Sequence, residues 1–237
     1  MAFIAFLVGA VLFSVIVKKL IRRFTIIFYV LALAVSFLYL ASYYGWVTVN
    51  LPPLFNMIMQ KGIPGMAFIV IVMFIGVFQE GSRIRRYLMP IRGELSIIGS
   101  ILLIVHIVRR LTNYFTIVFF GPAASTNIVA AFWIALVILV LLLLLTITSF
   151  NIIRRMMDAR SWKSLQRLAY VFFALVYVHI LLFLVPAALA GGSTALESVI
   201  VYSVMFVAYA VLRIRAHFNR NKVRPEPLDL DSAAREA

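Results

Sequence analysis

Long apolar runs alternate with short polar segments along most of the chain. Read in windows of membrane-spanning length, this pattern predicts seven apolar spans. They cover residues 2–17, 24–46, 66–78, 95–120, 128–150, 168–190 and 196–212. The third span is short, and residues 54–63 extend it as an interfacial segment. Since about 20 apolar residues in a helix cross a bilayer core of about 30 Å, the pattern predicts an all-α, multi-pass transmembrane bundle.

The composition excludes a soluble protein. Of the 237 residues, 65% are apolar and only 13% are charged. A soluble domain carries roughly a quarter of charged residues, because its surface must be hydrated. We therefore expect the chain to lie in the cell membrane (plasma or inner membrane), with the lipid bilayer as its main partner. Cysteine is absent, which excludes disulfides, thiolate-bound metals and covalently attached haem.

The basic residues predict the orientation of the bundle. Nearly all of the 22 Lys and Arg residues fall in four segments, which are 18–23, 79–94, 151–167 and the stretch after Leu212. Lys61 lies in a segment of the opposite set. The positive-inside rule assigns the basic segments to the cytoplasm, so we expect an external N-terminus and a cytoplasmic C-terminus. The net charge of +14 is explained by topology, and we expect no nucleic-acid partner.

Two histidines lie in the middle of predicted spans. His106 and His179 each follow the start of their span by 11 residues, which places both about 16–17 Å into the membrane. Two histidines at matched depth on different helices can ligate one haem iron from opposite sides. The alternative is that each hydrogen-bonds a neighbouring helix. His217 belongs to the basic C-terminal segment, where we expect a surface residue.

Three neighbours of His106 fit the haem interpretation. Arg109 and Arg110 share its helix face at i+3 and i+4, where guanidinium groups can neutralise haem propionates. The alternative for this pair is that both side chains extend to the outer interface. Gly99 lies at i−7, where a missing side chain leaves room for a flat macrocycle or for helix packing.

Three segments carry a resemblance to a known family. They are Pro90–Leu95 leading to His106, the Trp133 span ending at Thr146–Ser149, and Trp162–Tyr170 leading to His179. In their order and spacing the chain resembles the ferric-reductase-like transmembrane haem proteins. Within these it most resembles the haem-subunit family of the bacterial periplasmic methionine sulfoxide reductase system. The resemblance covers roughly residues 66–185. It implies a six-helix haem core over residues 24–218, preceded by an extra N-terminal transmembrane helix over 1–23 and followed by a disordered cytoplasmic tail over 219–237.

The chain departs from the two-haem members of this family at two positions. Arg92 and Gln166 stand where those proteins carry their inner ligands, and neither side chain is a haem ligand. The resemblance therefore implies one haem b per chain, with a flavin (FMN or FAD) near the cytoplasmic side. The candidate flavin contacts are Arg85, Arg86, Arg92, Arg154, Lys163 and Gln166. Positive-inside charge is the alternative explanation for the basic members of this set.

These observations predict an electron-transfer subunit of a membrane oxidoreductase. Ligation by two histidines leaves no open position on the iron, so such a haem passes electrons. We expect a cytosolic flavin reductase or membrane quinol as donor, and an extracytoplasmic reductase or small molecule as acceptor. One alternative is a transporter that uses the intramembrane arginines and histidines as an anion or proton path. Against it, no inverted repeat and no mid-span carboxylate are visible. A non-catalytic membrane scaffold is a third possibility.

Overall fold

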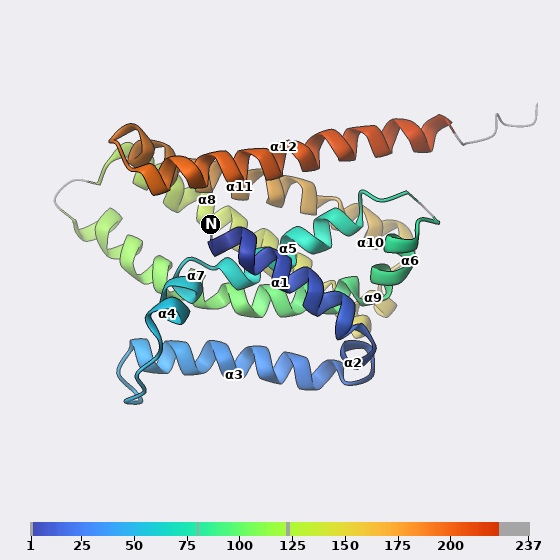
Figure 1. Cartoon of the computed structure of the whole chain (residues 1–237), viewed down its shortest axis with the longest axis horizontal. Helices are drawn as coiled ribbons and strands as arrows, with labels where there is room; N and C mark the ends of the chain where they lie inside the picture. Colours follow the sequence, from blue (N-terminus) through green and yellow to red (C-terminus); the bar gives the residue numbers. More distant parts are fainter. Residues whose placement is uncertain (1, 80, 122–123, 223–237) are drawn as a thin grey trace, which may run out of the picture.

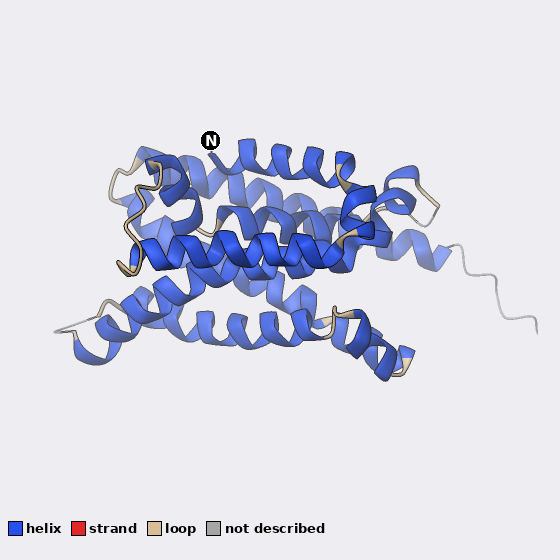
Figure 2. Cartoon of the chain, turned by 90° about the horizontal axis from the view of Figure 1, so that it is seen from below, coloured by secondary structure: helices blue, strands red, loops and turns tan. Residues whose placement is uncertain are grey.

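The computed structural model describes residues 2–79, 81–121 and 124–222, and within them every regular element is a helix (Figure 2). Apolar runs without Gly or Pro in their centres form the long helices, whereas the basic segments between them form short ones. In chain order the elements are α1 (Ala2–Ile16), α2 (Lys18–Arg23), α3 (Thr25–Tyr43), α4 (Pro53–Gln60), α5 (Ile63–Ile75), α6 (Arg83–Leu88), η1 (Met89–Ile91), α7 (Arg92–Phe120), α8 (Thr126–Ile147), α9 (Asn151–Met156), α10 (Ala159–Gln166), α11 (Leu168–Leu189) and α12 (Ser193–Lys222).

In the described part of the chain, five helical segments are long and apolar enough to cross a membrane. They are Thr25–Tyr43, Arg83–Phe120, Thr126–Ile147, Ala159–Leu189 and Ser193–Asn219. Much of their surface is apolar and exposed, as lipid-facing helices require. The predicted all-α fold is confirmed, and its long apolar helices are those of a multi-pass membrane protein.

The predicted count of seven spans is not confirmed. The short third span is a bent pair, α4 and α5, whose axes differ by 51° across residues 61–62. Counting this pair as one crossing gives six. Helix α1 has 15 residues and a length of about 22 Å, which is less than the bilayer core of about 30 Å.

Helix α5 lies in the centre of the bundle. Nearly all of its residues are buried, and they belong to both of the large apolar clusters of the core. It packs closely on α7 and also on α1, so the predicted extra N-terminal helix is part of the core. The other close pairs are α8 with α11, α11 with α12, and α3 with α7.

The short basic helices gather at one end of the bundle. Figure 1 shows α2, α6, α9 and α10 together on the right, whereas α4 lies at the opposite end. These helices carry three of the four basic segments, and the C-terminal end of α12, which carries the fourth, points to the same side (Figure 1). This grouping is what the positive-inside pattern requires. Helix α12 continues to Lys222, so the predicted tail over 219–237 begins as a helix; residues 223–237 lie outside the described residues.

Candidate functional site

His106 is held by the turn between α4 and α5. Its Nδ1 lies 2.8 Å from the backbone carbonyl oxygen of Gln60. A carbonyl oxygen only accepts, so Nδ1 carries the hydrogen and, in the neutral ring, Nε2 keeps its lone pair. On the same side, a Cβ placed on Gly62 would lie 3.0 Å from the Cβ of His106. One backbone turn, between α4 and α5, therefore both accepts the hydrogen bond of His106 and packs against its side chain.

His179, on α11, makes the equivalent bond to α8. Its Nδ1 lies 3.2 Å from the carbonyl oxygen of Ala131 in α8, and its ring meets Phe183 edge-on at 5.2 Å. The same reasoning gives an Nδ1–H tautomer with a lone pair on Nε2. Among the described residues, neither Nε2 atom has a hydrogen-bond partner.

The structure places the two predicted histidines on α7 and α11, within range of an electrostatic interaction. In the described part of the chain these two helices do not pack closely on each other; both pack on α8. Tyr114 and Phe183 join them by a ring contact at 5.2 Å, one or two turns beyond the histidines. We call the pair His106 and His179, with their surroundings, the histidine level.

The two arginines that follow His106 have different surroundings. Arg110 lies over the ring of Tyr114 at 6.0 Å and interacts electrostatically with both histidines. Arg109 turns to α3, where it donates to the hydroxyl of Tyr39 and lies 4.3 Å from the ring centre of Tyr43. Among the described residues, its Nε is buried without a hydrogen-bond partner. Both arginines interact electrostatically with His106, and Arg110 does so also with His179.

The space expected beside Gly99 is filled by protein. A Cβ on Gly99 would lie 2.9 Å from the Cβ of Phe68 and 3.1 Å from the carbonyl oxygen of Gly65. On the other side of the contact, a Cβ on Gly65 would lie 2.6 Å from the carbonyl oxygen of Gly99. These two glycines allow α5 and α7 to touch backbone to backbone, as small residues do in membrane bundles. The macrocycle interpretation of Gly99 is replaced by helix packing.

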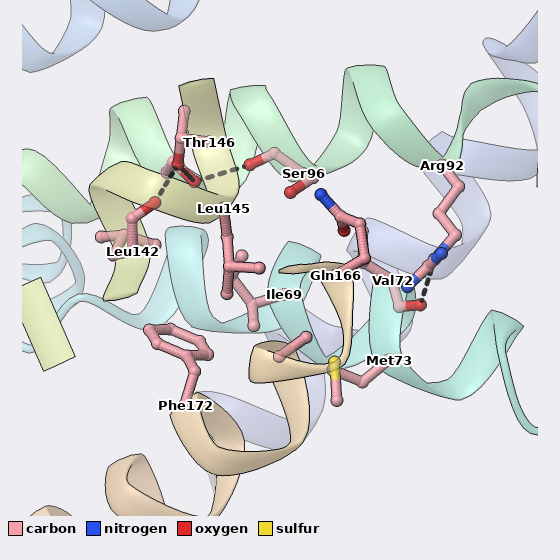
Figure 3. A pocket seen from close by; sticks show the side chains of 12 residues that line it. Ile69, Val72, Met73, Arg92, Ser96, Leu142, Leu145, Thr146, Gln166 and Phe172 are labelled. Atoms are coloured by element: carbon pink, nitrogen blue, oxygen red, sulfur yellow. Dashed lines mark hydrogen bonds between the residues drawn. The ribbon is translucent and has the colours of Figure 1, made fainter. Parts of the chain in front are cut away.

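Arg92 and Gln166 line one small cavity at the basic end of the bundle. Figure 3 shows them facing it from α7 and α10, together with Ser96 and Thr146. Arg92 donates from Nε to the carbonyl of Val72 at 3.2 Å. Gln166 donates from Nε2 to the hydroxyl of Thr148 at 3.1 Å. We call this region the cavity level.

The cavity does not fit a flavin. Its volume is about 30 Å³, and a single water needs about 10–15 Å³ by the same measure. A water or two would find polar partners there, whereas a three-ring flavin would not enter without moving α7 from α10.

The remaining candidate flavin contacts are spread over the basic end. Arg85 donates to the carbonyl of Phe78 at 3.0 Å, and Arg154 lies over the Trp162 ring at 4.6 Å. Arg86 belongs to α6 and Lys163 to α10. The structure does not bring the whole set around one space.

Sequence reasoning missed Arg213. Its guanidinium on α12 donates to the carbonyl of Gly76 at 3.0 Å, bonds the hydroxyl of Tyr170 and lies 4.7 Å from that ring. With Arg85 and Arg92, it is the third arginine that bonds a carbonyl at the basic end of α5. The last carbonyls of a helix lack partners within it and favour cations. The carbonyl groups at the end of α5, a short buried helix that ends at Ile75, need hydrogen-bond donors. Nothing in the sequence indicates that residue 213 supplies one of them.

The available metal ligands are few. Among the described residues, no group of three or more His, Asp or Glu side chains could hold a metal ion. The histidine level offers instead two neutral imidazole nitrogens, which suits an iron whose other four ligands come from a porphyrin.

Comparison with known protein sequences finds a bacterial relative. An uncharacterized protein of Treponema pallidum (strain Nichols) is 34% identical over 157 residues, which are 66% of this chain and 43% of the relative. The chain thus matches less than half of that protein's length. No protein-family model matches the chain, and no solved structure does.

Proposed function

We propose that the chain is an integral membrane b-type haem protein that passes electrons to an extracytoplasmic acceptor. The observation that carries the proposal is the shared state of His106 and His179. Each ring donates from Nδ1 to a backbone carbonyl and keeps the lone pair of Nε2. Histidines that ligate a metal commonly donate their other N–H in this way, since the bond fixes the ring and raises its basicity.

The residues present fit one haem. Two Nε2 ligands from α7 and α11 would hold the iron from opposite sides, and α8 keeps those helices apart. A haem so ligated exchanges single electrons and has no open position for oxygen. Arg110 interacts electrostatically with both rings and would neutralise a propionate. Arg109 would add positive charge from the α3 side.

The cavity level supports one haem per chain. Its side chains are bonded to protein groups, and its space holds water at most. Electrons would therefore arrive from a membrane quinol or from a flavin bound to a cytosolic reductase. If α1 and the α4–α5 pair each cross the membrane, the chain has seven spans, with the basic end in the cytoplasm and the N-terminus outside.

Pyridine haemochrome analysis of the purified full-length protein tests the proposal. We expect one b-type haem per chain and sharp low-spin bands in the reduced-minus-oxidised spectrum. A colourless protein that stays colourless when refolded or reconstituted with haem would overturn the proposal. Two haems per chain would overturn the conclusion that the cavity level holds no haem.

A further inference from the structure

The turn between α4 and α5 contacts His106 in two ways. Its backbone carbonyl at Gln60 accepts from Nδ1, and Gly62 lies against the Cβ and Cγ of the same side chain. We call residues 60–62 the elbow. It belongs to a bent helix pair that is far from His106 in sequence and that carries no candidate ligand of its own.

The carbonyl of Gln60 is available because of Pro64. In a continuous helix this oxygen would accept the N–H of residue 64, but proline has none. The helix instead bends by 51° at this place. The buried oxygen then needs a donor, and the Nδ1–H of His106 at 2.8 Å supplies it.

Gly62 allows the close approach. Its φ of 67° lies in the left-handed region, which glycine adopts without steric cost. A Cβ there would lie 3.0 Å and 3.1 Å from the Cβ and Cγ of His106. Any other residue at this position must therefore strain the turn or push the histidine.

The second histidine lacks such an arrangement. The carbonyl of Ala131 lies within α8, where it also accepts the N–H of the next helical turn, and its distance to the Nδ1 of His179 is 3.2 Å. The bond between His106 and the carbonyl of Gln60 is shorter, and this carbonyl accepts no helical N–H. The two rings are therefore held unequally.

We propose that the elbow is the positioning element of the haem site and that Gly62 is its positioning residue. The elbow would select the Nδ1–H tautomer of His106 and set the plane of its ring. It would also make His106 a stronger electron donor to the iron than His179. This inference rests on the proposed haem function. It deepens that function, since it identifies which of the two ligands the protein tunes and through which backbone.

Low-spin EPR spectra of the haem-loaded full chain test this inference, because the g values report ligand orientation and strength. We expect Gly62→Ala to shift the g values and to lower the haem content. The matched control is Gly45→Ala, since Gly45 has a φ of 74° and no atom within 4 Å of an added Cβ. It imposes the same backbone strain without touching a histidine, and we expect wild-type g values.

A second pair of variants separates the effect of the steric contact with His106 from the effect of backbone strain at residue 62. Asparagine tolerates the left-handed region but still carries a Cβ. We expect Gly62→Asn to accumulate even if Gly62→Ala does not, and to keep the shifted g values, while Gly45→Asn matches wild type. Wild-type g values in Gly62→Asn would overturn the positioning role while leaving the haem in place. Absence of low-spin haem from the wild-type protein would instead overturn the proposed function.

Discussion

The histidine level and the cavity level lie on the same two helical segments but offer opposite chemistry. Arg92 precedes His106 by 14 residues, and Gln166 precedes His179 by 13, so the levels are about 20 Å apart along both segments. At the histidine level each side chain bonds the protein with one nitrogen and keeps the other available. At the cavity level Arg92 and Gln166 donate to a carbonyl and a hydroxyl around a space of about 30 Å³.

The difference shows that matched depth is not enough to make a cofactor site. Both pairs lie on the same two helical segments. The two levels differ in the coordinating capacity that each side chain keeps after its structural bonds, and the cavity level has room for water at most. The following experiments test these differences and the packing around the two levels.

Removing a ligand should have the largest effect. We expect His106→Ala and His179→Ala each to abolish the low-spin haem spectrum, because the iron loses one axial ligand. His217→Ala is the control and should keep the wild-type spectrum. Absorption spectra of the three purified variants decide the matter; an unchanged spectrum in either mid-span variant would remove that histidine from the site.

Closing the glycine contact should destabilise the region that joins the two levels. A Cβ on Gly65 would lie 2.6 Å from the carbonyl oxygen of Gly99 and 2.7 Å from the backbone nitrogen of Leu103. Since backbone atoms cannot rotate away, we expect Gly65→Ala to lower the free energy of unfolding by about 1–3 kcal/mol. Unfolding in mixed detergent measures it. The control is Gly9→Ala, whose added Cβ meets nothing within 4 Å; equal losses in both variants would contradict the packing argument.

Acidification should loosen α10, which carries Gln166. Asp158 caps this helix by accepting from the backbone N–H groups of Arg160 and Ser161, both at 2.9 Å. Hydrogen bonds from Ser161, through its side chain and its backbone, hold the pKa of Asp158 below its usual value. The stabilisation is therefore present at neutral pH and is lost as the pH falls through the lowered pKa.

Hydrogen exchange of the α10 amides, corrected for intrinsic rates, measures this loosening. We expect protection to decrease below about pH 4 in the wild type. Asp158→Asn keeps a capping oxygen that does not titrate, so its protection should be independent of pH in this range. The same pH dependence in both proteins would show that another group controls the helix.

Adding ligands to the cavity level should have the smallest effect. In the double variant Arg92→His, Gln166→His an imidazole stands at both positions, but the cavity of about 30 Å³ stays too small for a porphyrin. We expect pyridine haemochrome analysis still to give one haem per chain. A second haem would show that ligand identity, and not room, distinguishes the two levels.

The sequence predicts the long helices well because basic clusters bound their apolar runs. The predicted span 95–120 became Arg92–Phe120, and 168–190 became Leu168–Leu189. Depth counting also placed the two mid-span histidines at one level, and their joint ligation of an iron stays a prediction. It could not predict that Arg109 turns to Tyr39 or that Phe68 fills the space at Gly99, because i+3 and i−7 spacing gives a helix face but not the helix that covers it.

The shortest predicted span was the least well described. Residues 54–63 were expected to extend it, and most of them form α4, which continues into α5 across a bend of 51°. The sequence did not predict that the backbone of this bend would bond His106. Gly62 and Pro64 mark a break in the sequence, but the donor that this break requires is more than 40 residues away. Arg213 was missed for the same reason, since its partner Gly76 is 137 positions earlier.

The bond between Arg213 and Gly76 also has a consequence for the order in which the protein is made. The ribosome releases α5 long before α12, so this bond can form only after the last helix has been made. It then ties the end of the central helix to the C-terminal helix. A chain cut before residue 213 would lack the guanidinium group that bonds the carbonyl of Gly76.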